Sequence, residues 1–357
     1  MVTRLRVGVI YGGRSGEHEV SVASAASIFR HLDAARYEAV PIRIEKTGRW
    51  TLGAQVPRVL SAGGDQGQRA EALQPVEPSA AVAASSLDVV FPVLHGPYGE
   101  DGTVLGLLEL ANVPYVGAGV LGSAAGMDKA VMKTLFAARA LPIVPHLVAL
   151  RHAWDRDTAG MTRQVSDTLH YPVFVKPANL GSSVGISKVP AEADLAGAMG
   201  IAFEFDRKAV IEAAVPGARE LECAVLGNDE PRASIVGEII PSREFYDYEA
   251  KYADRGSELL IPAPLTARQT AEIQRFAIDA FRAVEGAGMA RVDFLMARDS
   301  DEIFVNEVNT IPGFTTISMY PKLWEASGLA YPALLDRLIE LALERHAEKQ
   351  RLRTSLT

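Results

Sequence analysis

The chain has 357 residues, more than a single hydrophobic core usually serves, so two or three domains are expected. Its 48% hydrophobic and 22% charged residues are typical of a globular protein rather than a disordered one, and its net charge of -8 argues against a general nucleic-acid binder. There is no apolar run long enough to span a membrane, no signal-peptide pattern at the N-terminus, and only one cysteine, Cys223, which excludes an internal disulfide, so we expect a cytoplasmic protein.

The first 120 residues alternate strands with helices. Strands that are nearly all apolar are predicted at 5–13 (LRVGVIYGG), 37–44, 87–96 and 113–117. Strands of this kind need cover on both faces, which predicts a doubly wound parallel sheet as the first domain, residues 1–120. A stretch rich in Gly, Ala, Gln and Ser at 61–86 is expected to be a surface excursion.

The remaining chain changes character, and we expect two further domains, residues 121–217 and 218–357. In the first of these, a helix at 127–140 precedes two strands joined by a Gly/Ser loop at 171–189, a helix at 191–202 and a strand at 209–215. From residue 219 on, strands follow one another with one helix at 266–285, which indicates an antiparallel sheet. The stretch 241–258 lacks periodicity and is expected to be a long loop that covers a site, and the tail from about 332 is expected to be a surface helix.

Two motifs match known fingerprints but lack the required context. GAGVLG (117–122) has the letters of the dinucleotide-binding turn, but no acidic residue ends the region that should form the next strand. GSSVG (181–185) matches the serine-hydrolase elbow, but a strand follows it, and the only later histidine is His346 in a polar terminal helix. The seven histidines and one cysteine also show no zinc-binding spacing.

The GSSVG loop is better interpreted as a phosphate lid. Its small residues expose backbone N–H groups, and two serine hydroxyls add donors. Lys176 ends an apolar strand five residues earlier, where a buried lysine needs an anionic partner. Lys129 could be a second phosphate ligand; the alternatives are an ordinary hairpin turn and a solvated surface lysine.

Oxygen-bearing side chains lie at the ends of two predicted strands. Arg291 and Asp293 share one strand face, as do Glu307 and Asn309, because side chains two apart point to the same side. If the two strands pair, Asp293, Glu307 and Asn309 converge into a set of hard ligands that suits Mg²⁺. The alternative is a structural salt bridge between Arg291 and these acids. No P-loop and no protein-kinase motif set is present.

These residues resemble a known family, the D-alanine–D-alanine ligases of the ATP-grasp superfamily. The resemblance covers essentially the whole chain except 45–86, and it is carried in order by these motifs: GGRSGEHEVS (12–21), LHGPYGEDG (94–102), MDK (127–129), VKPANLGSSVGISKV (175–189), FYDYEAKY (245–252), ARVDF (290–294) and NEVNTIPGFT (306–315). It implies a mixed α/β and α+β fold of three domains, in which the doubly wound N-terminal domain precedes two domains that clamp ATP.

The resemblance also implies roles for individual residues. The residues implied in nucleotide binding are Lys129, Lys176, Ser182, Ser183, Glu212, Ala213, Ala214, Val215, Glu220 and Lys251. Two Mg²⁺ ions, replaceable by Mn²⁺, would be held by Asp293, Glu307 and Asn309. The implied catalytic residues are Glu17, Ser182, Tyr252, Arg291 and Gly313. The implied contacts to the two amino-acid substrates are Glu17, His95, Arg291, Ser318 and Met319.

The activity implied is ATP-dependent joining of two D-alanines through an acyl phosphate, for peptidoglycan precursor synthesis. Alternatives are a D-alanine–D-lactate ligase, another carboxylate–amine ligase of the superfamily, and a nucleotide-binding module without turnover. Lys251 and Tyr252 favour the dipeptide product. Ala213 and Ala214 replace larger residues of some members, which puts details of purine packing in doubt. We expect small-molecule substrates, no nucleic acid and no membrane as partners; homodimers are common in the family.

Overall fold

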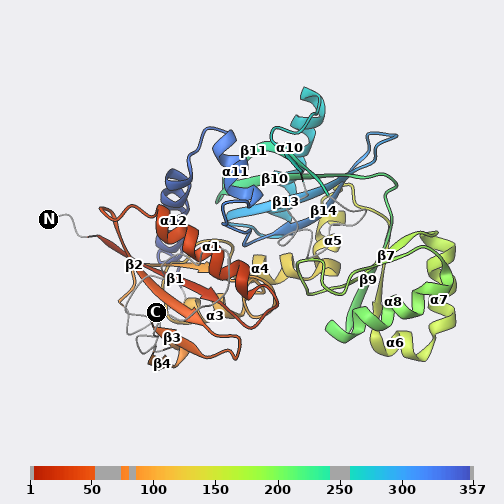
Figure 1. The fold of residues 1–357 in the computed structure, drawn as a ribbon, viewed down its shortest axis with the longest axis horizontal. Coiled ribbons are helices and arrows are strands. Elements are labelled where there is room, and N and C mark those ends of the chain that lie inside the picture. Colours follow the sequence, from red (N-terminus) through yellow and green to blue (C-terminus); the bar gives the residue numbers. More distant parts are fainter. Residues whose placement is uncertain (1–3, 53–73, 80–85, 242–257, 354–357) are drawn as a thin grey trace.

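A computed structural model describes residues 4–52, 74–79, 86–241 and 258–353. Three β-sheets lie within these ranges, one in each of the three predicted domains (Figure 1). The loop predicted at 241–258 lies almost entirely outside the described residues, as does most of the predicted excursion at 61–86. The exact domain boundaries stay a prediction.

The N-terminal sheet is built around β1 (Leu5–Gly12), which pairs in parallel with β2 (Tyr37–Ile44) on one side and β5 (Val89–Val93) on the other. Helices α1 (His18–His31) and α12 (Tyr331–Lys349) share a buried core with one face, and α3 (Thr103–Leu110) packs on the other. The prediction of a parallel sheet covered on both faces is therefore correct for these three strands.

Three predictions for this region were incomplete. Two short edge strands, β3 (Trp50–Leu52) and β4 (Gln74–Val76), extend the sheet in antiparallel fashion, so the sheet is mixed and the predicted excursion contributes a strand. The strand predicted at 113–117 is reduced to one parallel bridge between Val90 and Tyr115. The terminal helix α12 is not confined to the surface, because an apolar stripe that includes Leu334 and Leu338 is fully buried.

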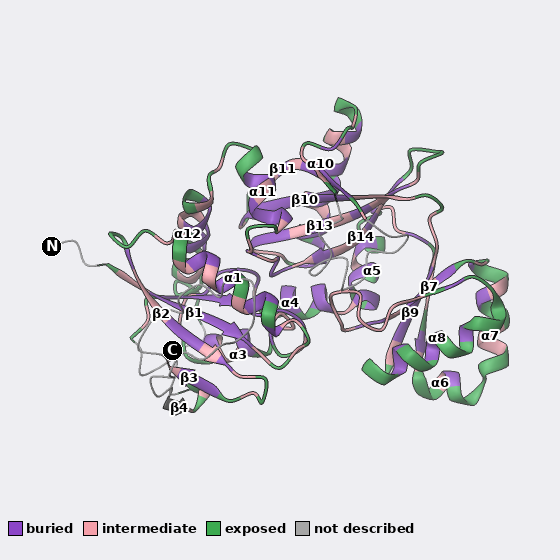
Figure 2. Ribbon diagram, viewed as in Figure 1, coloured by how far each residue is buried: buried purple, intermediate pink, exposed green. Residues whose placement is uncertain are grey.

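The central sheet has the order β6-β9-β7-β8, with every pair antiparallel. Its strands are β6 (His146–Leu150), β7 (Val173–Pro177), β8 (Ser187–Val189) and β9 (Lys208–Ala213). One face packs on α6 (Arg151–Arg156), α7 (Thr158–Thr168) and α8 (Glu192–Phe205), whose outer sides are exposed in Figure 2. These helices do not cover the other face of the sheet, which is turned toward the rest of the molecule.

The C-terminal sheet is antiparallel, as predicted, in the order β12-β11-β10-β13-β14. Its strands are β10 (Arg219–Gly227), β11 (Arg232–Ile240), β12 (Glu258–Leu260), β13 (Gly288–Met296) and β14 (Ile303–Asn309). Helix α10 (Ala267–Ala283) starts at a Thr266–Gln269 capping box and covers one face together with α5 (Lys129–Ala138). Helix α11 (Met319–Ala326) joins the core shared with the N-terminal sheet, so one core links the two sheets.

The glycines of GAGVLG have a packing role. Helix α4 (Val120–Met127) lies so close to the turn before β13 that a Cβ on Gly122 would be 2.5 Å from the Glu285 carbonyl oxygen and 3.0 Å from that of Val284. Gly117 has φ +97, which disfavours a side chain. The glycines of the motif therefore allow one backbone segment to approach another closely. This packing role is consistent with the prediction that the motif is not a dinucleotide site.

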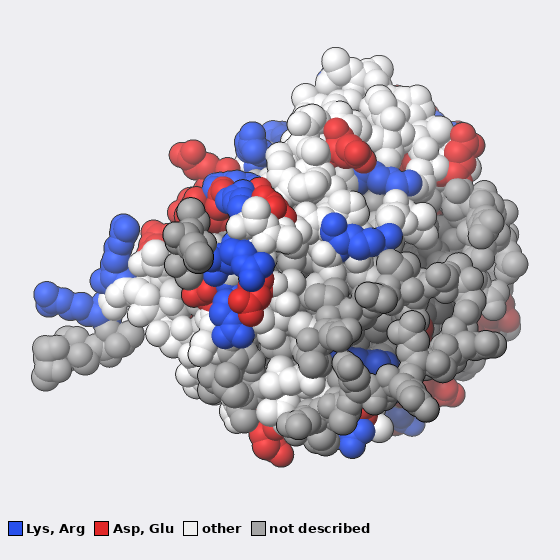
Figure 3. All heavy atoms as spheres, turned by 60° about the vertical axis from the view of Figure 1, so that its left-hand side comes forward, with Lys and Arg blue, Asp and Glu red and all other residues white. Residues whose placement is uncertain are grey.

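Basic and acidic side chains are interspersed on the face shown in Figure 3. Ion pairs among the described residues join Arg36 to Asp336 across elements and Arg337 to Glu344 within α12. Charges that alternate in sign neutralise one another locally, so the described part of this face offers no broad basic surface to a polyanion.

Replacing Gly122 with Ala should lower the free energy of unfolding by about 1–3 kcal/mol, because the new methyl group meets backbone that cannot yield. Gly106→Ala is the matched control: Gly106 lies inside α3 with nothing within 4 Å of a Cβ, so this variant should gain about 0.5–1 kcal/mol from helix propensity. Urea denaturation of both variants measures the difference. Equal stabilities would contradict the close packing of α4.

Candidate active site

The candidate metal ligands Asp293, Glu307 and Asn309 occupy neighbouring positions on β13 and β14. Asp293 lies opposite Glu307, and Arg291 lies opposite Asn309, so all four side chains rise from one face of the sheet. The Asn309 side-chain amide donates to Asp293 Oδ2 at 3.0 Å. The structure thus brings Asp293, Glu307 and Asn309 together, and their oxygens are of the kind that Mg²⁺ prefers.

A β-bulge lies in β14 beside this set. Asp293 pairs with Glu307 but the next residue, Phe294, pairs with Val305, which leaves Asn306 as the extra residue. Asn306 accepts a hydrogen bond from Lys176 Nζ of the central sheet at 3.4 Å. The strict alternation assumed from sequence did not reveal this contact between the two sheets.

Arg291 forms a salt bridge with the neighbouring acids, which the sequence analysis gave as the alternative to a metal site. Its Nε and Nη2 each lie 2.7 Å from an oxygen of Asp293, and its Nε is 3.0 Å from Glu222 Oε2 on β10. Burial alone would lower the pKa of Arg291, but Asp293 and Glu222 outweigh it and raise the pKa well above its ordinary value. Sequence reasoning missed Glu222, although its alternation with Glu220 along RELECAV was a usable signal.

Lys176 belongs to a buried group that shares one carboxylate. Glu212 of β9 is 2.6 Å from Lys176 Nζ and 2.9 Å from Lys133 Nζ of α5. Burial alone would raise the pKa of Glu212, but Lys133 and Lys176 outweigh it and hold the pKa far below its ordinary range. One carboxylate between two ammonium groups leaves an excess of positive charge, which suits a phosphate. Lys133 was also missed from sequence.

Lys129 is buried at 7% exposure, so the alternative of a solvated surface lysine is wrong. Its Nζ donates to the Leu180 carbonyl at 2.6 Å and lies 3.9 Å from Glu307 Oε2. Its backbone N–H is bonded to the Ala178 carbonyl at 3.0 Å, which fixes the start of α5 to the lid segment. Lys129 therefore stands between the lid and the carboxylates of the C-terminal sheet.

The lid between β7 and β8 turns tightly and reaches the N-terminal domain. Ser182, Ser183 and Gly185 all have positive φ, at 51, 59 and 72. The Ser182 hydroxyl donates to Glu17 Oε1, at the start of α1. This contact joins two of the implied catalytic residues, Glu17 and Ser182; Tyr252, another of them, and its neighbour Lys251 lie outside the described residues.

His95 follows β5 and is 6% exposed. Its Nδ1 lies 3.1 Å from the Ile311 carbonyl oxygen, and its Nε2 has no hydrogen-bond partner among the described residues. Burial lowers the pKa of His95, which favours the neutral ring. Because a carbonyl only accepts, Nδ1 carries the proton and Nε2 is left as an acceptor.

The turn after β14 supplies backbone rather than side chains. A Cβ on Gly313 would lie 2.8 Å from Ser318 Oγ, so there is no room for one. Ser318 Oγ also accepts from the Thr315 backbone N–H at 3.0 Å. The Met319 side chain is buried against Gly237, so a substrate contact by Met319 would have to come from its backbone at the N-terminus of α11.

Part of the predicted nucleotide-binding segment, residues 212–215, already has hydrogen-bond or ion-pair partners. The N–H groups of Ala213 and Ala214 are bonded to the carbonyls of Pro145 and Pro172, at 2.9 and 3.1 Å. The Glu212 side chain is committed to the two lysines, so the half-buried Val215 offers the next backbone group along the segment. Glu220 begins the following strand and is partly exposed.

Glu100 is a further acidic residue at this place that the sequence did not single out. It accepts from the Gly96 N–H at 2.8 Å, and a Cβ on Gly181 would be 3.0 Å from Glu17 Oε2 and 3.7 Å from Glu100 Oε1. Burial raises the pKa of Glu100 to about 8, and repulsion from Glu17 adds to the shift. The Glu17 carboxylate, the protonated Glu100 carboxyl and the neutral His95 thus offer acceptor atoms to a substrate ammonium group.

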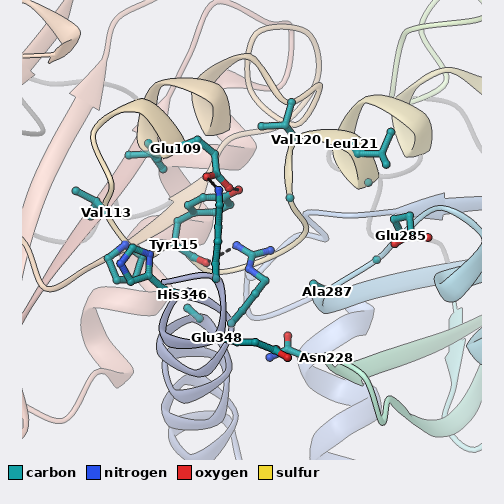
Figure 4. A pocket seen from close by; sticks show the side chains of 18 of the residues that line it. Glu109, Val113, Tyr115, Val120, Leu121, Asn228, Glu285, Ala287, His346 and Glu348 are labelled. Carbon is teal, nitrogen blue, oxygen red and sulfur yellow. Dashed lines mark hydrogen bonds and ion pairs between the residues drawn. The ribbon is translucent and has the colours of Figure 1, made fainter. Parts of the chain in front are cut away.

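A separate cavity of about 370 Å³ lies between α3, α4 and α12 (Figure 4). None of the predicted site residues lines it. Two of its basic groups are already engaged: Arg345 donates to the carbonyls of Gly117 and Tyr115, and Lys349 pairs with Glu109. This cavity is therefore distinct from the cluster described above.

Comparison with known proteins identifies the family of the chain. Family models described as "D-ala D-ala ligase N-terminus" and "D-ala D-ala ligase C-terminus" match residues 6–118 and 135–340. A D-alanine–D-alanine ligase of Heliobacterium modesticaldum is 52% identical over 353 residues, 97% of this chain and 96% of its own. The chain belongs to the D-alanine–D-alanine ligase family.

Solved structures of this family have the same fold. The D-alanine–D-alanine ligase of Coxiella burnetii superposes with a TM-score of 0.81 at 40% identity, covering 98% of this chain and 96% of its own. The VanG D-Ala:D-Ser ligase of Enterococcus faecalis gives the same TM-score at 34% identity, with 95% and 100% covered. The expected ATP-grasp architecture is confirmed. No described helix is long and apolar enough to cross a bilayer.

Because the pKa of Glu100 is raised, the stability of the folded protein should change with pH in a definite direction. Between the ordinary pKa of 4.5 and about 8, the folded protein holds a proton that the unfolded chain releases, so wild-type stability should fall as pH rises through this window. Glu100→Gln lacks this titration, so its stability relative to wild type should rise between pH 5.5 and pH 8 by roughly 1 kcal/mol or more.

Urea denaturation without substrates at several pH values measures this difference. Glu204→Gln, at an exposed position of α8, is the matched control and should show no such trend. A pH-independent difference between Glu100→Gln and wild type would contradict the buried, protonated carboxyl.

Proposed function

We propose that this protein joins two D-alanine molecules to D-alanyl-D-alanine with hydrolysis of ATP to ADP, a step of peptidoglycan precursor synthesis. The observation that carries the proposal is the meeting of three sheets at one place. Arg291 and Asp293 come from the C-terminal sheet, Lys176 from the central sheet, and Glu17 from the N-terminal domain, where it bonds the lid. The 52% identity to a D-alanine–D-alanine ligase over 97% of the chain supports it.

ATP would lie between the central and C-terminal sheets, under the lid. The excess positive charge of Lys133, Lys176 and Lys129 over Glu212 suits its phosphates. The Ser182 and Ser183 segment would cover them with backbone N–H groups. From the family resemblance we propose Val215 as a contact to the purine and Glu220 as a contact to the ribose.

Asp293, Glu307 and Asn309 fit a divalent cation because they offer hard oxygens on adjacent strands. We propose that they hold two Mg²⁺ ions, which Mn²⁺ can replace. When bound, the ions neutralise phosphate charge during transfer.

The reaction would proceed in two displacements. A carboxylate oxygen of the first D-alanine attacks the γ-phosphorus, ADP leaves, and an acyl phosphate forms. The amine of the second D-alanine then attacks the carbonyl carbon and loses a proton, and phosphate leaves with the bonding electron pair. The developing oxyanion needs preorganised donors, which the Arg291 guanidinium and the Gly313 N–H supply.

Other groups would bind and orient the amino acids. Glu17, with Glu100 beside it, suits the ammonium of the first D-alanine, and His95 Nε2 can accept one of its protons. The N-terminus of α11 at Ser318 and Met319 suits the carboxylate of the second. Tyr252 and Lys251 are proposed to complete the lid contacts and the phosphate site.

The second substrate differs among the similar proteins, since the VanG neighbour is named for D-serine. The 52% identity to a D-alanine–D-alanine ligase, against 34% to VanG, favours alanine. Small molecules are the proposed partners in a cytoplasmic location where ATP is available, and a homodimer is proposed from the family resemblance alone.

The proposal is tested by ADP release with a panel of D- and L-amino acids and D-lactate as second substrates. We expect ADP release to depend on D-alanine and the product to be D-alanyl-D-alanine. If the ester or D-alanyl-D-serine were the main product across a pH series, the second substrate would be D-lactate or D-serine instead of D-alanine. ATP binding without any ADP release with D-alanine would reject a ligase and favour a binding module.

Arg291→Ala should lower kcat by about 10²–10³, or roughly 2.7–4 kcal/mol of barrier, as removal of an oxyanion donor does. Arg219→Ala is the matched control, because Arg219 forms a similar pair with the buried Glu238 of the same sheet, at 2.6 and 2.8 Å, away from the cluster. Its activity should stay within about threefold of wild type when both are assayed below their unfolding temperatures. Equal losses in both variants would assign Arg291 a purely structural part.

A further inference from the structure

Three carboxylates stand abreast on one face of the C-terminal sheet. Glu222 on β10 lies opposite Asp293 on β13, which in turn lies opposite Glu307 on β14. Side chains of directly paired residues project from the same face, so Glu222 belongs to the row although it is farther from β14. Glu222 is buried, at 7% exposure.

Arg291 lies within reach of two of these carboxylates. Its Nε carries a single hydrogen, and this hydrogen is donated to Asp293 Oδ1 at 2.7 Å. Glu222 Oε2 is only 3.0 Å from the same Nε. The two carboxylates are thus alternative acceptors for one N–H.

Asp293 already uses three of the roughly four acceptor sites on its two oxygens. Both oxygens accept from Arg291, and Oδ2 also accepts from Asn309 at 3.0 Å. A cation bound at the proposed site takes at least one of these oxygens, which weakens the hold of Asp293 on Arg291. An oxyanion donor that loses its orientation loses much of its value.

We propose that Glu222 is a positioning residue that keeps Arg291 in place when Asp293 turns an oxygen to the divalent cation. This inference rests on the proposed function for its consequence in catalysis. The Arg291 Nε–H would then bond to Glu222 instead of Asp293, so the guanidinium would keep its orientation while an Asp293 oxygen held the divalent cation.

A purely structural role for Glu222 explains the geometry less well. Asp293 alone already pairs with Arg291 through two hydrogen bonds, so Glu222 is not needed to neutralise it. A buried carboxylate is costly, and the next residue on the same face, Ala224, is apolar and fully buried. The row holds three carboxylates against the Arg291 guanidinium and the Lys129 ammonium, which lies 3.9 Å from Glu307, so negative charge remains in excess and a divalent cation would offset it.

The test compares Glu222→Gln with Glu238→Gln. Glutamine keeps the shape and removes the charge. Glu238 is the matched control because it is equally buried, pairs with Arg219 through two bonds, and lies opposite Leu221, on the other face of the sheet. Unfolding temperatures of both variants show how much each carboxylate matters to stability alone.

Two readouts then separate positioning from stability. For Glu222→Gln we expect kcat to fall about 10- to 100-fold with KM for ATP within threefold, as loss of a metal-site supporting residue does. We also expect weaker Mn²⁺ binding in the presence of ADP, measured by electron paramagnetic resonance, with unchanged stoichiometry. Glu222→Asp, which keeps the charge, should recover part of both, and Glu238→Gln should change neither.

Three outcomes would overturn the proposal. A kcat within twofold of wild type and an unchanged Mn²⁺ affinity for Glu222→Gln would leave Glu222 a structural residue. A loss of bound Mn²⁺ per chain would make it a metal ligand instead. An equal change in Glu238→Gln would reduce the effect to sheet stability. The Mn²⁺ measurement needs no turnover, so it stands even if wild type fails to ligate D-alanine, which would refute the proposed function separately.

Discussion

The register between β13 and β14 is the constraint on which the site depends. Asp293 meets Glu307 and Arg291 meets Asn309 only in this pairing, and a slip of β14 by one residue would turn Glu307 and Asn309 to the opposite face, away from Asp293 and Arg291. The core itself enforces the register, because Val292 and Phe294 are buried on the opposite face. Burial of apolar side chains on one side thus fixes the positions of charged ones on the other.

Buried charge is tolerated here because each group shares a partner of opposite sign. Glu212 lies between Lys133 and Lys176, and Arg291 lies between Asp293 and Glu222. Breaking such a group by removing one member leaves an uncompensated charge, which costs more than the intact group contributes. The first group carries excess positive charge and the second excess negative charge, so together they are complementary to a nucleotide phosphate and its cation.

The three sheets are held close by different means. One core joins the N-terminal and C-terminal sheets through α11 and α12, and Gly122 lets α4 approach the turn before β13. The central sheet reaches the others through polar contacts, from Lys176 to Asn306 and from Ser182 to Glu17. Polar contacts between sheets break and re-form at lower cost than an apolar core. The contact region between sheets is also where the substrates are proposed to bind.

The sequence by itself determined the longer strands of the three sheets, though not β3, β4 and β6, and it determined the Gly/Ser lid and the candidate ligands Asp293, Glu307 and Asn309. These follow from periodicities of 2 and 3.6 and from residue chemistry, which are local properties of the chain. Glu100, Lys133, Glu222 and Asn306 were decided only by the tertiary structure. Each gains its place from a partner far along the chain or from a bulge that breaks the alternation. The same holds for α12, whose amphipathic pattern cannot say which sheet it will cover, because burial of an apolar face is not specific for its partner.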